Sequence, residues 1–487
     1  MPHPSPVRPR TVVVAALATG LLLPAAASAA WTPATEVDTD AGVSSLTVDG
    51  AGNRLVIGRK AAKGGAVDSR LVGITAAPKP DGLRTLKGVQ TAPVALDEDE
   101  LVFPRTKSMG TVRRTVPDGK GGTKSVSLTR YRLGVSVGAA PNAALGTLRS
   151  HGTAVLDEAP RFSGVANGNL AMGWSEVGDD GVVRVYAAWR RASTKAAVRL
   201  GTPKLISGSR SSRLLAMATG AGGKTVLVYQ QGASEKTRKL FVRSLDVRTG
   251  KLSKIQTLRR GGPGFPIVAA AVGSGGRAVI AWGEQDAATE RTKPFVVRAT
   301  TRDSDKGRFA VPKPIDTGTA AVRAPGGAVV AAVDGQNRAT VAWNQTVGSV
   351  ADGTAHDIPR VAESEATGGL GAVRDLAAAG RVHDVAVAGP TTGVVLVREQ
   401  ERPLGGSNGD RGVAVQAAFR PAGGALGAPE TIEAFTDAQL LDRSNAFGAA
   451  AIGALPDGRF SVAWTRATVA GDKLRSSTLF SDRTTAP

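Results

Sequence analysis

The chain has no cysteine and few aromatic residues, which make up 4% of its 487 positions and include only 3 Tyr. Without cysteine, neither a disulfide framework nor a thiolate metal site can form. Apolar residues make up 42% and charged residues 21%, as in ordinary globular proteins. A chain of this length buries a large core without disulfides. The absences therefore exclude a disulfide-stapled scaffold and favour a globular fold stabilised by its core.

Long hydrophobic runs are also lacking, except at the N-terminus. There the basic segment "MPHPSPVRPR" precedes "TVVVAALATGLLLPAAA", and Ala27 and Ala29 have the A-x-A spacing that signal peptidase accepts. A membrane anchor is the alternative, but the run is short for a spanning helix. We therefore predict a secretory signal peptide over residues 1–30, cleaved near Ala29 or Ala30. The mature chain, 31–487, is predicted to be one secreted domain without a transmembrane segment.

The charge is strongly basic, with a formal net charge of +20 to which Arg8 and Arg10 of the leader contribute. An exported basic protein can be held at anionic wall polymers, acidic polysaccharides or extracellular nucleic acid. The basic residues are scattered, however, and no run of five or six occurs. A composition rich in Ala, Gly, Val and Arg, as GC-rich genomes tend to encode, is the other explanation of the charge.

One phrase recurs along the chain, for example "VAAVDGQNRATVAW" ending at Trp343 and "AIGALPDGRFSVAW" ending at Trp464. The copies are roughly 55 residues apart and are followed by short runs rich in Val, Ile and Ala, with Gly, Asp, Asn and Pro turns between them. Each unit is therefore predicted to be four short antiparallel strands, which is the sequence signature of a β-propeller. The eight copies end at Arg59, Arg105, Trp174, Tyr229, Trp282, Trp343, Arg398 and Trp464.

Eight copies favour eight blades, and the irregular stretch 58–160 leaves seven blades with an insertion as the alternative. The last unit has three strands, and the mature N-terminus "WTPATEVDT" is similar to the fourth strand "FAVPKPIDT" of another unit. We therefore predict that the N-terminal strand completes the last blade and closes the ring, which removes an exposed edge. The recurring aromatic residue is predicted to wedge between blades. Two packed β-sandwich domains are the rival fold, but they would not produce a common period.

The units resemble those of exported actinobacterial β-propeller repeat proteins and, loosely, those of sialidase-type (BNR-like) propellers. The resemblance covers residues 31–487 and implies the fold, not an activity. Sialidase-type propellers carry S-x-D-x-G-x-T-W boxes, whereas here the Asp-Gly turn precedes the Trp strand in a different frame, "DGQNRATVAW", with no Ser-x-Asp before it. This departure argues against a sialidase.

Motifs for catalysis are weak. "GGSNG" places Ser407 in a G-x-S-x-G pattern, but it lies in a polar loop and not between a strand and a helix. "DGKGGTKS", residues 118–125, lacks the glycine and the helix of a phosphate-binding loop. The acidic run "LDEDEL", which includes residues 97–100, reads as charge on a turn.

Metal-binding patterns are equally weak. His151, His356 and His383 lie in separate segments without ligand spacing. The acidic pairs are shorter than a calcium loop and fit hairpin turns; they are Asp38 with Asp40 and Asp303 with Asp305. No catalytic, cofactor-binding or metal-binding residue is assigned, and no cofactor is expected.

The favoured function is a non-catalytic, monomeric binding or scaffold protein. It would contact a cell-wall polymer, a glycan or an extracellular protein, and no specific nucleic acid. The alternative is a secreted carbohydrate-active enzyme, glycosidase- or sialidase-like, with acids from several blades at the channel mouth. Two carboxylates with Arg or aromatic neighbours at one mouth would favour the enzyme. A site is expected in the insertions 107–122, 348–360 and 402–412, of which the last two should share one rim.

Overall fold

The computed structural model describes residues 31–38, 41–61, 67–77, 80–86, 93–95, 100–117, 122–139, 148–165, 168–190, 200–232, 237–261, 264–285, 295–317, 329–348, 354, 356–400, 411–441, 445–470 and 473–487. The predicted signal peptide, 1–30, lies outside these residues. So do Asp40, Ser407 and residues 97–99. Within the described chain, no helix has the length and apolar character needed to cross a membrane.

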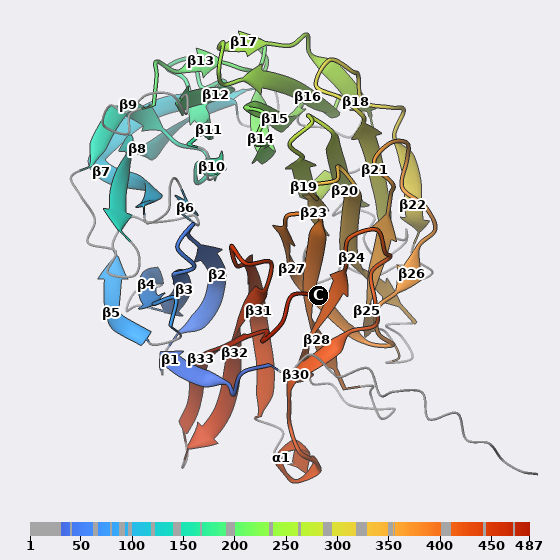
Figure 1. The fold of residues 1–487 in the computed structure, drawn as a ribbon. Helices are drawn as coiled ribbons and strands as arrows, with labels where there is room; N and C mark the ends of the chain where they lie inside the picture. Colours follow the sequence, from blue (N-terminus) through green and yellow to red (C-terminus); the bar gives the residue numbers. More distant parts are fainter. Residues whose placement is uncertain are drawn as a thin grey trace, which may run out of the picture.

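Antiparallel strands make up most of the described chain and are arranged around a common centre (Figure 1). We number eight successive strand groups as units 1 to 8. β1 (Thr35–Asp38) precedes unit 1, which comprises β2 (Gly42–Val48), β3 (Arg54–Ala61), β4 (Val67–Ile74) and β5 (Pro80–Leu86). Unit 2 comprises β6 (Val94–Ala95), β7 (Glu100–Pro117), β8 (Thr123–Ala139) and β9 (Arg149–Val155). Unit 3 comprises β10 (Arg161–Gly164), β11 (Leu170–Val177), β12 (Val183–Arg190) and β13 (Lys204–Leu205).

The later units follow the same order. Unit 4 comprises β14 (Ser212–Thr219), β15 (Lys224–Gln231), β16 (Lys239–Asp246), β17 (Lys251–Leu252) and β18 (Gln256–Arg260). Unit 5 comprises β19 (Gly264–Val272), β20 (Ala278–Gln285), β21 (Val296–Arg302) and β22 (Lys313–Thr317), and unit 6 comprises β23 (Val329–Val333), β24 (Ala339–Val347), β25 (His356–Glu363) and β26 (Arg374–Asp375). Unit 7 comprises β27 (Gly380–Ala388), β28 (Thr391–Glu399), β29 (Gly412–Arg420) and β30 (Glu430–Ala434), followed by α1 (Asp437–Leu441). Unit 8 comprises β31 (Ala446–Ala454), β32 (Phe460–Ala470) and β33 (Lys473–Asp482).

The all-β propeller architecture is confirmed, but the predicted number of eight blades is wrong for the described residues. Six units form separate sheets, whereas units 7 and 8 are hydrogen-bonded into one eight-stranded sheet. A single residue pair, Gly412 with Phe447, joins β29 to β31. A Cβ atom on Gly412 would meet the Phe447 carbonyl oxygen, so this close approach depends on glycine.

The repeated phrase occupies the same structural position in every unit. Its final residue lies in the second strand of every unit, that is in β3, β7, β11, β15, β20, β24, β28 and β32. Where that residue is Trp, the side chain is buried and packs against the preceding unit: Trp343, for example, packs with Ala271 and Val279 of unit 5. The prediction of an aromatic wedge between neighbouring units is therefore confirmed.

Each buried Trp in a second strand also donates its indole N–H to a carboxylate. The acceptor comes either from the same strand or from the preceding unit, and an arginine pairs with it in three cases. The bonds are Trp174 to Glu176 (3.2 Å), Trp282 to Glu284 (3.1 Å), Trp343 to Asp316 (2.8 Å) and Trp464 to Glu433 (2.6 Å), and the arginines are Arg298 on Glu284, Arg360 on Asp316 and Arg466 on Glu433. Burying the indole therefore leaves no donor unsatisfied.

Buried arginines lie at the first residue of a second strand or directly before it, and they bond to a neighbouring unit. Arg277 donates to the Ser364 hydroxyl (2.7 Å) and Arg338 donates to the Pro390 carbonyl (2.6 Å), each in the next unit. Arg54, only 1% exposed, pairs with Asp482 of unit 8 (Nε to Oδ1, 3.2 Å). The first unit is thus tied to the last strand of the chain.

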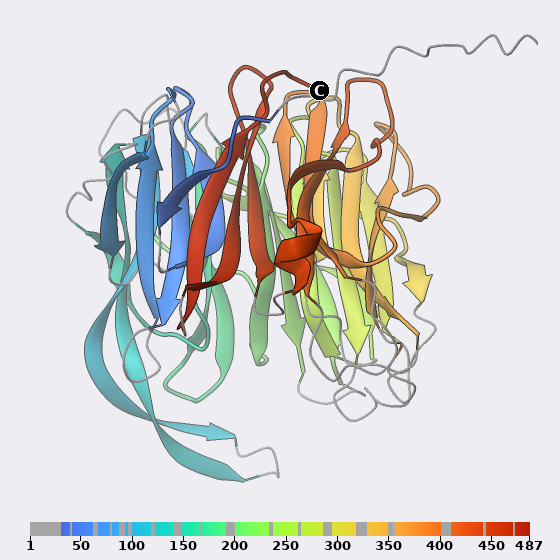
Figure 2. The same cartoon turned by 90° about the horizontal axis from the view of Figure 1, so that it is seen from below.

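The N-terminal strand lies on the last unit, as predicted. β1 pairs antiparallel with β33, with Thr35 opposite Phe480 and Glu36 opposite Leu479. The views in Figures 1 and 2 both show β1 beside β33. Unit 1 also packs on unit 8, where Val43 and Leu46 share an apolar cluster with Phe480.

We expect Arg54→Met to lower the free energy of unfolding by about 3–5 kcal/mol, because the substitution leaves a carboxylate buried without its partner. Asp482, the carboxylate concerned, is 2% exposed. Adding Asp482→Asn should recover part of the loss. The control, Arg459→Met, removes a more exposed pair with Asp457 and should cost less than about 1 kcal/mol. Equilibrium denaturation measures all four proteins, and equal losses in both single variants would contradict this account.

Candidate functional site

Second strands end, and third strands begin, at one edge of the ring. This edge is at the bottom of Figure 2, and we call it the lower rim. All three predicted insertions connect a second strand to a third. In the first, 107–122, the described residues up to Pro117 belong to β7, which forms with β8 a two-stranded ribbon that projects below the ring. Residues 118–121 of this insertion and most of the other two, residues 349–353, 355 and 402–410, lie outside the described residues.

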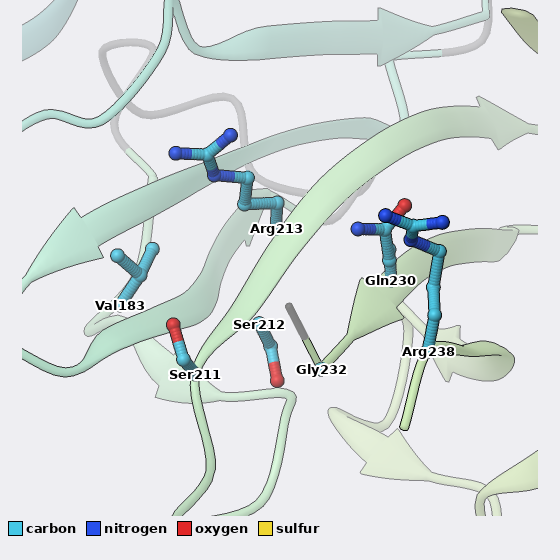
Figure 3. Close-up of a pocket in the computed structure, with 7 residues that line it drawn as sticks. All are labelled: Val183, Ser211, Ser212, Arg213, Gln230, Gly232 and Arg238. Carbon is cyan, nitrogen blue, oxygen red and sulfur yellow. The ribbon is translucent and has the colours of Figure 1, made fainter. Parts of the chain in front are cut away.

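A cleft of about 330 Å³ opens at the lower rim between units 3 and 4 (Figure 3). The start of β12, the start of β14, the end of β15 and the chain entering β16 form its wall. The described residues of its lining offer two guanidinium groups, two hydroxyls and an amide, and none of them carries a carboxylate or an imidazole. The lining residues are Val183, Ser211, Ser212, Arg213, Gln230, Gly232 and Arg238. Such donors suit an anionic or hydroxyl-rich ligand, but they supply no acid–base pair.

Hydrogen bonds fix the walls of this cleft. The Ser212 hydroxyl donates to the Arg210 carbonyl (2.8 Å) and accepts from the Gln231 amide (3.3 Å). At Gly232, φ is +90°, and a Cβ atom there would meet the Thr237 carbonyl, so the turn requires glycine. Arg213 pairs with Asp157 (2.7 Å), yet 54% of its side chain stays exposed. The cleft is therefore built before any ligand arrives.

A buried polar cluster lies at the lower rim between units 6 and 7. The Arg381 Nε atom is 2.8 Å from Asp357 Oδ2 and 3.2 Å from Glu399 Oε1, and Thr346 donates to Asp357 (2.6 Å). Both carboxylates are almost fully buried. Two carboxylates with an arginine are the arrangement that would favour an enzyme. At another unit interface the reverse arrangement occurs, with Glu284 between Arg259 and Arg298, and there the ion pairs link strands and units.

His383 and Asp384 occupy an irregularity of β27, where the pairing with β28 skips His383. The Asp384 carboxylate accepts from the backbone N–H of Val385 (2.8 Å) and of Ile452 in unit 8 (3.2 Å). Burial raises the pKa of Asp384 to about 6. Burial, and secondarily the charge of Arg381, lowers the pKa of His383 to about 4. This pair bridges two units inside the sheet structure.

The remaining residues singled out in the sequence do not converge. The His356 Nδ1 atom lies 2.9 Å from the Thr354 carbonyl oxygen, and the side chain of His151 lies outside the described residues. Asp303 pairs with Arg277 and Asp305 with Lys224, so both carboxylates take part in ion pairs. Asp38 pairs with Arg70. Over the described ranges, no three His, Asp or Glu side chains gather as a metal site would require.

Two structural features were not predicted from the sequence: the basic residues near the start of second strands, and the cleft. In five of the eight units a basic residue at or directly before the start of the second strand lies five positions before the last residue of the phrase, and this repeated spacing is visible in the sequence. The pairs are Arg54 with Arg59, Lys224 with Tyr229, Arg277 with Trp282, Arg338 with Trp343 and Arg459 with Trp464. The cleft had no such signal, because its residues come from separate strands and share no motif.

No protein-family profile and no curated protein matches the sequence. The fold is similar to solved structures at very low identity. The polysaccharide lyase Uly1 is 10% identical, with 90% of this chain and 89% of that chain covered and a TM-score of 0.39. The β-propeller domain of the Trilobed protease from Pyrococcus furiosus is 9% identical, with coverages of 82% and 99% and a TM-score of 0.40. A neuraminidase-like protein from A/bat/Guatemala/164/2009 is 8% identical, with coverages of 82% and 93% and a TM-score of 0.33.

The shifted pKa values of His383 and Asp384 predict opposite pH effects on stability. The folded state keeps the Asp384 proton that the unfolded state loses above pH 3.8, so this group makes stability fall as pH rises towards 6. His383 resists protonation in the folded state, so this group makes stability fall as pH drops from 6.5 towards 4. Between pH 4 and 6 the two effects oppose each other.

In the Asp384→Asn variant only His383 still titrates with a shifted pKa, so the free energy of unfolding should rise with pH in this window, by up to about 1.4 kcal/mol per pH unit. In the His383→Gln variant the free energy of unfolding should instead fall as pH rises. Urea unfolding between pH 4 and 6 measures both. Slopes that match the unmodified protein in both variants would show that these two groups do not titrate as described.

Proposed function

We propose that this chain is an exported β-propeller that binds an anionic polymer at its lower rim without altering it chemically. The cleft between units 3 and 4 carries the proposal, because the lining residues that the structure describes combine Arg213 and Arg238 with hydroxyl and amide donors and include no carboxylate. Guanidinium groups bind carboxylates and phosphates by paired hydrogen bonds.

The overall charge supports an anionic ligand. The net charge of +20 falls only to +18 when Arg8 and Arg10 leave with the leader, and it draws polyanions towards the surface. Several of the acidic residues that could oppose this are buried and paired with arginines, as Asp316, Glu399 and Asp482 are. The leader at residues 1–30 would deliver the protein outside the cell, where wall polymers and acidic glycans are the available polyanions. We propose that it acts there as a monomer.

Ring closure would make the lower rim one continuous surface. We propose that β1 on β33, together with the contacts of unit 1 on unit 8, closes the ring. Three features support this proposal: the β1–β33 pairing, the buried Arg54–Asp482 pair, and the bond from the Val43 N–H to the Thr465 hydroxyl (2.8 Å). The equivalent bond, Leu214 to Ser175 (2.9 Å), joins units 3 and 4 elsewhere in the ring. Unfolding of Arg54→Met in a separate early step confined to units 1 and 8 would support closure, and unchanged unfolding would contradict it.

A secreted carbohydrate-active enzyme is the second candidate, favoured by the Asp357–Arg381–Glu399 cluster. Retaining glycosidases place two carboxyl groups about 5 Å apart, and two oxygens bonded to one Nε atom are necessarily close. Both carboxylates are almost fully buried and bonded to Arg381, however, so neither is presented to a substrate. Binding is therefore the better reading of this chemistry.

The test is retention of the mature protein on immobilised polygalacturonate at low and high salt, with the supernatant assayed for new reducing ends. We expect salt-sensitive retention, no shortening of the polymer, and at least a threefold weaker binding by Arg213→Gln/Arg238→Gln. The control, Lys306→Gln/Arg308→Gln, removes the same charge from exposed positions on the opposite rim and should bind almost normally.

Equal loss in both double variants would show that charge alone, and not the cleft, holds the polymer. Shortening of the polymer that Asp357→Asn abolishes would replace binding by the enzyme.

A further inference from the structure

The ribbon of β7 and β8 extends well beyond its own sheet. β6 pairs with β7 only at Leu101 and Val102, and β9 pairs with β8 only over residues 130–135. From Thr111 to Pro117, β7 pairs with β8 alone among the described strands. Figure 2 shows this two-stranded part below the ring. A two-stranded ribbon is marginal in water, so its projection needs a support.

That support is the turn between β11 and β12 of unit 3. Arg114 pairs with Asp179 (2.5 Å). Gly181 lies so close that a Cβ atom there would meet the Thr115 carbonyl oxygen and the Val116 Cα atom. Val183, two residues beyond Gly181, lines the cleft. The ribbon is therefore fixed beside the cleft on the same rim.

The two faces of the ribbon differ. Alternate residues point to opposite faces, and the pairing sets which side chains share a face. One face carries the partly buried apolar residues Val112, Val116, Val126 and Leu128, and the same alternation places the side chains of Arg114, Lys124 and Arg130 on this face too. The other face carries three cross-strand pairs, Thr111 with Thr129, Arg113 with Ser127 and Thr115 with Ser125, of which only Thr129 is partly buried and the rest are exposed.

The ribbon is also cationic. Residues 106–117 and 122–132 contain no Asp or Glu, and their basic residues are Lys107, Arg113, Arg114, Lys124, Arg130 and Arg132. Four of these six are exposed: Lys107, Arg113, Lys124 and Arg130. The hydroxyl face thus surrounds the Arg113 guanidinium, and the exposed Lys124 and Arg130 add positive charge from the other face of the same ribbon.

We propose that this ribbon is the docking surface for an acidic polysaccharide, a polymer that carries both carboxylates and free hydroxyls. The inference rests on the proposed function and adds the surface and the chemical class of its ligand. Arg113, Lys124 and Arg130 complement the carboxylates. Ser and Thr hydroxyls both donate and accept hydrogen bonds, as sugar hydroxyls do, whereas a phosphate chain offers acceptors only. In the two-stranded part, described over residues 111–117 and 123–129, no residue is aromatic, so the stacking that holds single-stranded nucleic acid has no platform there.

The experiment measures the affinity of the mature protein for soluble polygalacturonate at constant salt. The variant Arg113→Gln/Lys124→Gln/Arg130→Gln should bind about tenfold more weakly or worse, since three exposed ion pairs are lost together. A matched control, Lys254→Gln/Lys306→Gln/Arg308→Gln, removes three exposed charges away from the lower rim and should stay within about twofold. Ser125→Ala/Ser127→Ala should also weaken binding, while leaving its salt dependence unchanged. Thermal unfolding confirms that each variant is folded.

The outcomes separate the two proposals. If the wild-type protein binds and the ribbon variant binds equally well, the ribbon inference is overturned and the proposed function stands. If the wild-type protein does not bind polygalacturonate, both fall. If polyphosphate or double-stranded DNA of equal charge competes as well as polygalacturonate, and the serine substitutions have no effect, the ligand class is overturned in favour of a phosphate polymer.

Discussion

The fold depends on burying an indole ring at each of several unit interfaces while its N–H group keeps a hydrogen-bond acceptor. A four-stranded sheet exposes two apolar faces, and each must be covered by a neighbour. Trp282 and Trp343 cover such faces, and their N–H groups bond to Glu284 and Asp316. These carboxylates would be costly to bury alone, so arginines pair with them. The repeated phrase is therefore the visible part of a Trp–carboxylate–Arg network that joins neighbouring units.

This network decides where function can reside. Arginine pairing of the same kind, without a Trp, engages other buried acids at the interfaces, including Asp357 and Glu399, and so keeps them from facing a ligand. The turns on the opposite rim also take part in contacts between units, since Arg277 and Arg338 each donate a hydrogen bond to the next unit there. The lower rim keeps cations and hydroxyls in a cleft and on a ribbon. The exposed cations and hydroxyls of the lower rim therefore form a surface suited to binding a polyanion.

The period, the four-strand unit and the wedge at Trp343 could be read from the sequence, because turn residues and β-branched runs are local signals. The number of separate blades could not, because one contact, Gly412 with Phe447, merges two units. The stretch around Lys107 looked like an insertion, but its alternation of hydroxyl and apolar side chains is that of a ribbon. The cleft around Ser212 depends on strands that meet only in three dimensions.

Hydrogen–deuterium exchange with and without polygalacturonate tests the central claim most directly. Bound polymer should slow exchange in β7 and β8 below the ring and at the start of β14, all on the lower rim. Exchange in the turns of the opposite rim should be unchanged. Binding accompanied by protection at those turns, or along β27 around Asp384, would contradict the assignment of the polymer to the lower rim.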